Sequence, residues 1–161
     1  DTAAETKPAP SLLAPDVDAP TAQVEQSEGV VDDRPGAKAR ALITKMRTAG
    51  ELDLDGLFAA AQSAQRDGEL PDAYLLYFSA AREGHADAAL ALGRQADPAT
   101  YVAGESVFEG PDLTQAHKWY QVAARNGSTA ARDDLTALRA RVERMAADGD
   151  PEAQRIALLW Q

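Results

Sequence analysis

Two twelve-residue segments of this chain align without a gap at an offset of 43 residues. Residues 73–84 read AYLLYFSAAREG, and residues 116–127 read AHKWYQVAARNG. The identical pairs are Ala73/Ala116, Tyr77/Tyr120, Ala80/Ala123, Ala81/Ala124, Arg82/Arg125 and Gly84/Gly127. A repeat of this length favours folds in which one supersecondary unit packs against a copy of itself.

The repeated segments have the composition of closely packed helices. Hydrophobic residues make up 45% of the chain but aromatic residues only 6%, and alanine and leucine dominate the apolar share. Alanine loses no side-chain entropy in a helix, and an Ala-Ala pair near a helix end lets a neighbouring helix pack closely. The glycine that follows can take the left-handed conformation that turns the chain back. We therefore predict an all-α fold, a short α/α solenoid of antiparallel helix pairs.

Apolar spacing and capping residues set the expected helix limits. Helices are predicted over residues 37–48, from Asp53 or Asp55 to Gly68, from Pro71 to Gly84, from Gly84 to Gly93 or Gln95, from Asp112 to Gly127, from Ser128 to Gly149, and over 151–161. Gln115, three residues after Asp112, completes a capping-box pattern. Two prolines and two glycines make residues 96–111 a predicted long loop.

The second copy resembles the Sel-one-like repeats, which are short relatives of the tetratricopeptide repeats. Their second helix carries an Ala-Leu-x-Trp-Tyr-x-x-Ala-Ala-x-x-Gly motif, and their first helix ends in a Leu-Gly pair. The matching residues are Ala116, Trp119, Tyr120, Ala123, Ala124 and Gly127 for the first motif and Leu92 and Gly93 for the second. Residues 146–154 are similar to the same junction a third time.

The resemblance covers residues 57–161 and departs from the family pattern twice. Residues 94–111 are longer than the family's turn, and between Gly127 and Gly149 one long helix stands where a pair is expected. The resemblance implies a protein that presents a concave surface to partner proteins or peptides and assembles multi-protein complexes. It implies neither a catalytic site nor a cofactor.

Residues 1–35 differ from the rest of the chain. They contain five prolines and eight acidic residues, with a single base before Arg34. Such a segment buries too little apolar surface to offset its ordering entropy. We therefore predict an extended acidic tail over 1–35 and a helical repeat domain over 36–161. The tail is either a solvated spacer or a second protein contact, made through Leu12, Leu13, Val30 and Val31.

The charge and the residue inventory disfavour several classes of function. Acidic residues outnumber basic ones 26 to 16, for a net charge of −10. Binding to nucleic acids or to anionic membrane surfaces requires clustered basic residues instead. No apolar run approaches the roughly 20 residues of a transmembrane helix. The chain has no cysteine and two histidines, His85 and His117, which lack the spacing of metal ligands. Capping or solvated roles account for both.

No constellation for catalysis is present in the sequence. Ser106 lacks the second glycine and the strand-to-helix setting of a nucleophile elbow, and no glycine-rich phosphate loop precedes a helix. A hydrolase would have to depend on Glu105 or Ser106, and the sequence shows no acid-base or nucleophile-base pair that includes either residue. We therefore expect no enzyme activity and no cofactor.

The candidate protein-binding residues lie outside the repeat motif. Tyr101 and Phe108 fall in the predicted loop, where they either pin the loop to the helices or meet a partner. Arg139, with Arg141 and Arg144, forms either a solvated face or a basic stripe for an acidic segment. Trp160 lies on a last helix with no following repeat to cover it, which suggests that a partner or sister copy does so.

The function predicted from the sequence is a non-catalytic scaffold or adaptor that binds proteins on a helical-repeat surface. The alternative is an accessory subunit bound permanently in a larger cell-envelope or membrane complex. The small polar residues at the start of the sequence are typical of a mature end left by a signal peptidase, so a periplasmic or otherwise exported location is expected. A trimmed cytoplasmic protein is the alternative.

Overall fold

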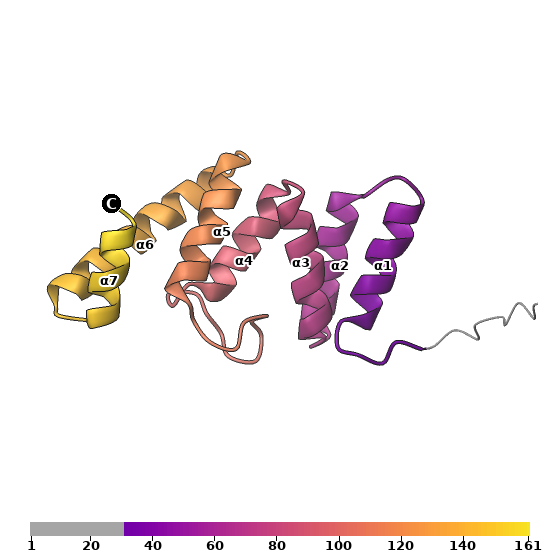
Figure 1. The fold of residues 1–161 in the computed structure, drawn as a ribbon, viewed down its shortest axis with the longest axis horizontal. Helices are drawn as coiled ribbons and strands as arrows, with labels where there is room; N and C mark the ends of the chain where they lie inside the picture. Colours follow the sequence, from indigo (N-terminus) through magenta and orange to yellow (C-terminus); the bar gives the residue numbers. More distant parts are fainter. Residues whose placement is uncertain (1–30) are drawn as a thin grey trace, which may run out of the picture. The chain divides into compact units, whose positions relative to one another are not determined.

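The computed structural model describes residues 31–161, and within this range it contains seven helices and no strand (Figure 1). The helices are α1 (Ala37–Thr48), α2 (Leu54–Arg66), α3 (Leu70–Arg82), α4 (Ala86–Ala96), α5 (Leu113–Arg125), α6 (Thr129–Ala147) and α7 (Pro151–Leu159). They form one compact unit that runs from Asp32 to Gln161. The predicted all-α class is therefore confirmed for the described residues.

The two aligned segments fold as matching helices. α3 and α5 each have 13 residues, and both their first and their last residues lie 43 positions apart, at Leu70 and Leu113 and at Arg82 and Arg125. The helices that follow, α4 and α6, are capped by His85 and Ser128, whose side chains accept from Ala88 and Ala131 backbone N–H groups. The sequence alignment thus corresponds to a repeat of local structure.

The turn after each matching helix has the same geometry. Gly84 has φ 99° and Gly127 has φ 98°, the left-handed region in which a residue with a side chain is strained. The residue that follows each glycine makes the same backbone bond: the His85 N–H donates to the Ala80 carbonyl, and the Ser128 N–H to the Ala123 carbonyl, both at 3.0 Å. These bonds satisfy carbonyls that the helix end leaves free.

Alanines fill the contacts between helices, as their positions in the repeat predict. Ala73, Ala80, Ala116 and Ala123 are all fully buried. Each helix from α2 to α6 packs against the next one along the chain, and α1 packs against α3. Ala124 is the exception in the motif, since it is half-buried while its counterpart Ala81 is 1% exposed.

Gly93 allows α4 to lie directly against an aromatic ring of α5. A Cβ atom at this position would come within 2.5 Å of the Tyr120 ring, a distance that no side chain can occupy without movement of the ring. Gly93 is helical and has no special backbone angle, so its role is to leave space. This accounts for the Leu-Gly pair that the sequence places there, because Leu92 is fully buried beside it.

Residues 97–112 form the predicted loop, shifted by one residue because Ala96 belongs to α4. The Asp112 N–H donates to the Ala96 carbonyl at 2.8 Å, so the two ends of the loop meet. Within residues 31–161, no helix has the length and apolar character needed to cross a bilayer. The same residues contain no group of three or more side chains suited to hold a metal ion.

Candidate protein-binding surface

The loop 97–112 is fastened to α4 by hydrogen bonds from its centre. The buried Ser106 hydroxyl donates to the Gln95 carbonyl at 2.9 Å and accepts from the Phe108 N–H at 3.0 Å. The Gln95 side-chain oxygen accepts from the Val107 N–H at 3.0 Å. Ser106 therefore holds the loop in place, and its hydroxyl is already engaged in both directions.

The two aromatic residues of the loop are both half-buried. The Phe108 ring meets the ring of Tyr74 on α3 edge-on, with centroids 6.0 Å apart. The Tyr101 hydroxyl donates to the Glu109 carbonyl across the loop at 2.9 Å. Phe108 thus pins the loop to the helices, which was one of the two predicted roles. Contact of Tyr101 or Phe108 with a partner stays a prediction.

An open cavity of about 480 Å³ lies between the loop and the start of α3. Its apolar lining includes Leu70, Pro71, Tyr74, Tyr101 and Phe108. Next to Tyr101, the side chain of Val102 is 50% exposed. Aromatic side chains that are partly held and partly open to solvent suit protein recognition, because little conformational entropy remains to be lost on binding.

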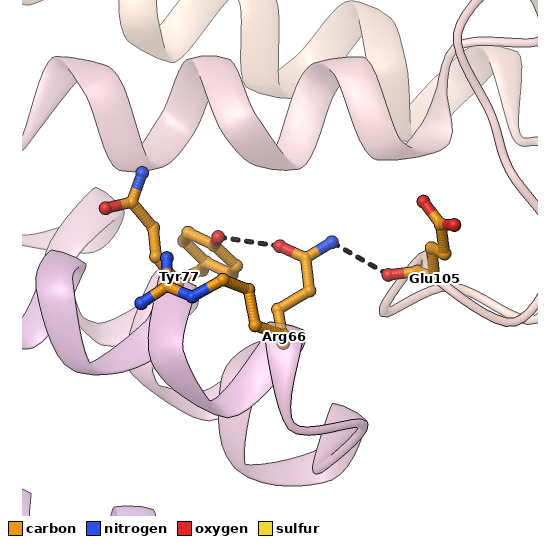
Figure 2. Close-up of a pocket in the computed structure, with 5 residues that line it drawn as sticks. Arg66, Tyr77 and Glu105 are labelled. Atoms are coloured by element: carbon orange, nitrogen blue, oxygen red, sulfur yellow. Dashed lines mark hydrogen bonds between the residues drawn. The ribbon is translucent and has the colours of Figure 1, made fainter.

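A second cavity, of about 450 Å³, is lined by α2, α3 and the same loop (Figure 2). The Tyr77 hydroxyl donates to the Gln65 side-chain oxygen at 2.7 Å, and the Gln65 amide donates to the Glu105 carbonyl at 2.7 Å. These are the two dashed lines of Figure 2. Burial raises the pKa of Tyr77, which keeps this hydroxyl a donor.

Two charged side chains beside these hydrogen bonds, Arg66 and Glu105, are open to the cavity. Within residues 31–161, neither the Arg66 guanidinium nor the Glu105 carboxylate takes part in an ion pair or hydrogen bond. Figure 2 draws both beside the Gln65 bridge. The cavity is therefore lined by one side chain of each charge.

The arginines of α6 do not act as one basic stripe. Arg141 donates from Nη1 to the Asp97 carboxylate at 2.7 Å, and Asp97 is only 4% exposed. Arg139 is exposed, and its Nη2 lies 3.4 Å from Nε2 of His117. Arg141 is therefore committed to a buried carboxylate and is not free for an acidic partner.

Trp160 has a neighbour within the chain. Its ring stacks on the His117 imidazole of α5, with centroids 4.0 Å apart and an angle of 8° between the planes. Burial, and then the charge of Arg139, lower the pKa of His117. The uncovered apolar residues at this end are Leu158 and Leu159, each 71% exposed.

The apolar patches predicted in the tail fall almost wholly outside the described residues. Leu12, Leu13 and Val30 belong to residues 1–30, which the structure does not describe. Val31 is described and is 77% exposed. Their role in binding stays a prediction.

Two residues that support the loop and the neighbouring helices were not identified from the sequence. Gln65 and Asp97 stand at the ends of α2 and α4, and each accepts a hydrogen bond from the repeat tyrosine of the following helix. Each also comes four positions after a buried small residue, Ala61 or Gly93. That spacing is the signal that could have identified them.

Comparison with known protein families, with characterised proteins and with solved structures gave no match. The function is therefore inferred from the helices and their surface.

Proposed function

We propose that this protein is a non-catalytic scaffold that binds partner proteins on the surface of a short α/α solenoid. The observation that carries this proposal is the anchored loop 97–112, which holds Tyr101 and Phe108 beside Tyr74 at an open cavity. Ser106 and Gln95 fix the loop before any partner arrives. Preorganised aromatic residues of this kind are common anchors of protein interfaces.

The matching helices support the solenoid part of the proposal. α3 and α5 share their length, their closing glycine geometry and their buried alanines. We infer that each left-handed turn returns the chain antiparallel, so that successive helix pairs stack as in the Sel-one-like repeats. Repeat architectures of this type offer long surfaces that bind proteins.

The chemistry of the polar side chains supports the absence of catalysis. His85 accepts from the Ala88 N–H through Nδ1 at 3.1 Å, and its Nε2 lies 2.8 Å from the Asp55 carboxylate. Ser106 is buried and bonded to backbone on both sides. His85, a possible base, and Ser106, a possible nucleophile, therefore both have structural roles.

The test is to change an exposed side chain next to the cavity lining without touching the residues that anchor the loop. Val102→Asp places a charge beside Tyr101, and Ala137→Asp on an exposed position of α6 is the matched control. Proteins that co-purify with the wild-type chain from its native source should be lost with Val102→Asp and kept with Ala137→Asp. Equal recovery with both variants, at equal helical content, would overturn the proposal.

The exposed leucines of α7 favour a second candidate, a permanently bound accessory subunit of a larger complex. Leu158 and Leu159 are adjacent and each 71% exposed, and a permanent neighbour would remove this apolar surface from water. Native size measurement distinguishes the candidates. An obligate subunit migrates entirely with its complex, whereas a scaffold that exchanges partners also occurs alone.

A further inference from the structure

A groove of about 530 Å³ lies between α3 and α5, toward their C-terminal ends, away from the loop residues described above. Its lining combines apolar side chains with three cations. The residues that matter here are Phe78, Trp119 and Val122 among the apolar ones, and Arg82, Lys118 and Arg125 among the charged ones. Trp119 is 2% exposed and Phe78 is half-buried, whereas the three cations are exposed. The groove therefore has an apolar base and a cationic edge.

Aromatic rings hold two of the cations in place. The Arg82 guanidinium lies 5.5 Å from the centre of the Phe78 ring, and the Lys118 ammonium lies 4.8 Å from the centre of the Trp119 ring. The two rings meet edge-on, with centroids 5.7 Å apart. Cation–π contacts restrict long side chains that would otherwise move freely, so the charges are partly ordered in advance.

The repeat brings the third cation to the same groove. Arg125 is the counterpart of Arg82, and each occupies the last residue of its helix. Within residues 31–161, none of Arg82, Lys118 and Arg125 forms an ion pair. One acid, Glu83, also lines the groove. A net positive site thus stands on a chain whose total charge is −10.

We propose that this groove binds an acidic peptide segment of a partner protein. An aliphatic or aromatic side chain of that segment lies on Phe78 and Val122, and neighbouring aspartate or glutamate carboxylates pair with Arg82, Lys118 and Arg125. The volume is within the range of roughly 300–1,000 Å³ found for small binding sites. The inference rests on the proposed function, that the helical surface binds proteins, and it assigns the chemistry of one partner segment.

The charge distribution favours a short acidic peptide over a nucleic acid. Long polyanions are bound through many phosphate contacts and are repelled by a protein with a large negative net charge. A peptide with a few carboxylates needs only the three local cations, and its apolar side chain gains from leaving water. The combination of apolar base and cationic edge matches that ligand.

The experiment measures fluorescence anisotropy of two labelled hexapeptides with the full chain. The acidic probe is DELFDE, and its uncharged isostere is NQLFNQ. We expect DELFDE to bind at least about tenfold more tightly than NQLFNQ, and its binding to weaken as salt rises, because exposed charge pairs are screened. Equal binding of the two probes would overturn the proposal.

Matched variants locate the binding. The triple variant Arg82→Gln, Lys118→Gln, Arg125→Gln should weaken DELFDE binding by about tenfold or more. The control triple Lys45→Gln, Arg47→Gln, Arg144→Gln removes the same charge from last turns of other helices and should leave it unchanged. The double variant Arg82→Lys, Arg125→Lys keeps the charge and should retain binding, which separates a charge effect from loss of fold.

The outcomes also separate this inference from the proposed function. If the groove triple binds DELFDE as the wild type does while Val102→Asp loses the native partners, the groove assignment is wrong and the scaffold stands. If the groove triple alone loses the probe and Val102→Asp keeps every native partner, the groove assignment stands and the loop surface is wrong. Tighter, groove-dependent binding of duplex DNA than of DELFDE would overturn the peptide assignment.

Discussion

The Tyr120 hydroxyl donates a hydrogen bond to the buried Asp97 carboxylate at 2.9 Å, and Tyr77, its counterpart 43 residues earlier, donates to Gln65 at 2.7 Å. The same contact therefore links the end of one helix to the middle of the next in both copies, with a charged acceptor in one and a neutral acceptor in the other. Burial, and then the Asp97 charge, raise the pKa of Tyr120, which keeps this hydroxyl protonated.

Tyr120→Phe should cost more stability than Tyr77→Phe. Removing the Tyr120 hydroxyl leaves an ionised, nearly buried carboxylate with Arg141 and the Ala99 N–H as its remaining partners, and we expect a loss of about 2 kcal/mol. Tyr77→Phe removes a bond to a neutral amide, and we expect about 1 kcal/mol. Urea unfolding of both variants checks the order. Equal losses would show that the charge of Asp97 is unimportant.

Gly93→Ala should destabilise the protein because the new methyl group meets the Tyr120 ring. We expect a cost of about 1–3 kcal/mol, as for other overpacked cores. Gly110→Ala is the matched control, since nothing lies within 4 Å of a Cβ atom there. Thermal unfolding of the two variants is the measurement, and an unchanged midpoint for Gly93→Ala would contradict the close approach of α4 and α5.

Gly127→Ala should lower the free energy of unfolding by roughly 1–2 kcal/mol through backbone strain alone. The space around Gly127 is open, and its φ of 98° is the only obstacle to a side chain. Gly127→Asn should therefore be milder, because asparagine tolerates the left-handed region better. Denaturant unfolding compares the two. A larger loss with asparagine than with alanine would indicate a steric cause.

Protonation of His117 should destabilise the folded state. Its pKa is lowered in the fold by burial and by Arg139, so the unfolded chain takes up a proton first as the pH falls. The contribution of His117 is therefore intact above the ordinary pKa of 6.5 and declines as the pH drops through that value. The imidazole pKa, followed by NMR, should lie below that of a solvent-exposed histidine.

His117→Phe isolates this effect from the titration of carboxylates. Phenylalanine keeps an aromatic ring beside Trp160 and removes the ionisable group. The stability difference between wild type and variant should then change between pH 7.5 and pH 5.5, with the wild type losing more. A difference that stays constant over this interval would rule out a role for His117 in acid sensitivity.

Helix limits were predictable from the sequence because capping residues mark them locally. Asp53, Asp112 and Ser128 each accept a backbone N–H at the start of a helix as expected. The capping box at Asp112 is only half formed, however. The Gln115 side-chain oxygen accepts from the Trp119 indole N–H at 3.1 Å instead, because a nearby side-chain donor within the helix competes for it.

The surface could be predicted only in part. Tyr101 and Phe108 stood out because aromatic residues are unusual in a polar loop, but their anchor Gln95 lies on another element and makes its bonds to backbone groups. Likewise Arg82 and Arg125 were visible as a repeated pair, whereas their common groove arises only when α3 packs near α5. Local patterns identify the residues, and tertiary packing decides which of them meet.

The spacing of the helix caps shows where the chain tolerates extra length. Asp53 and His85 are separated by 32 positions and His85 and Ser128 by 43, yet the tyrosine contact recurs in both pairs. The loop 97–112 has 16 residues where the turn between α2 and α3 has three, and α4 is two residues shorter than α2, which leaves the eleven additional positions. The ends of the loop are joined by the bond from Asp112 to Ala96. Foreign sequence grafted into this loop should leave the helices in place, provided that Ser106 and Phe108, which fasten the loop to α4 and α3, are kept.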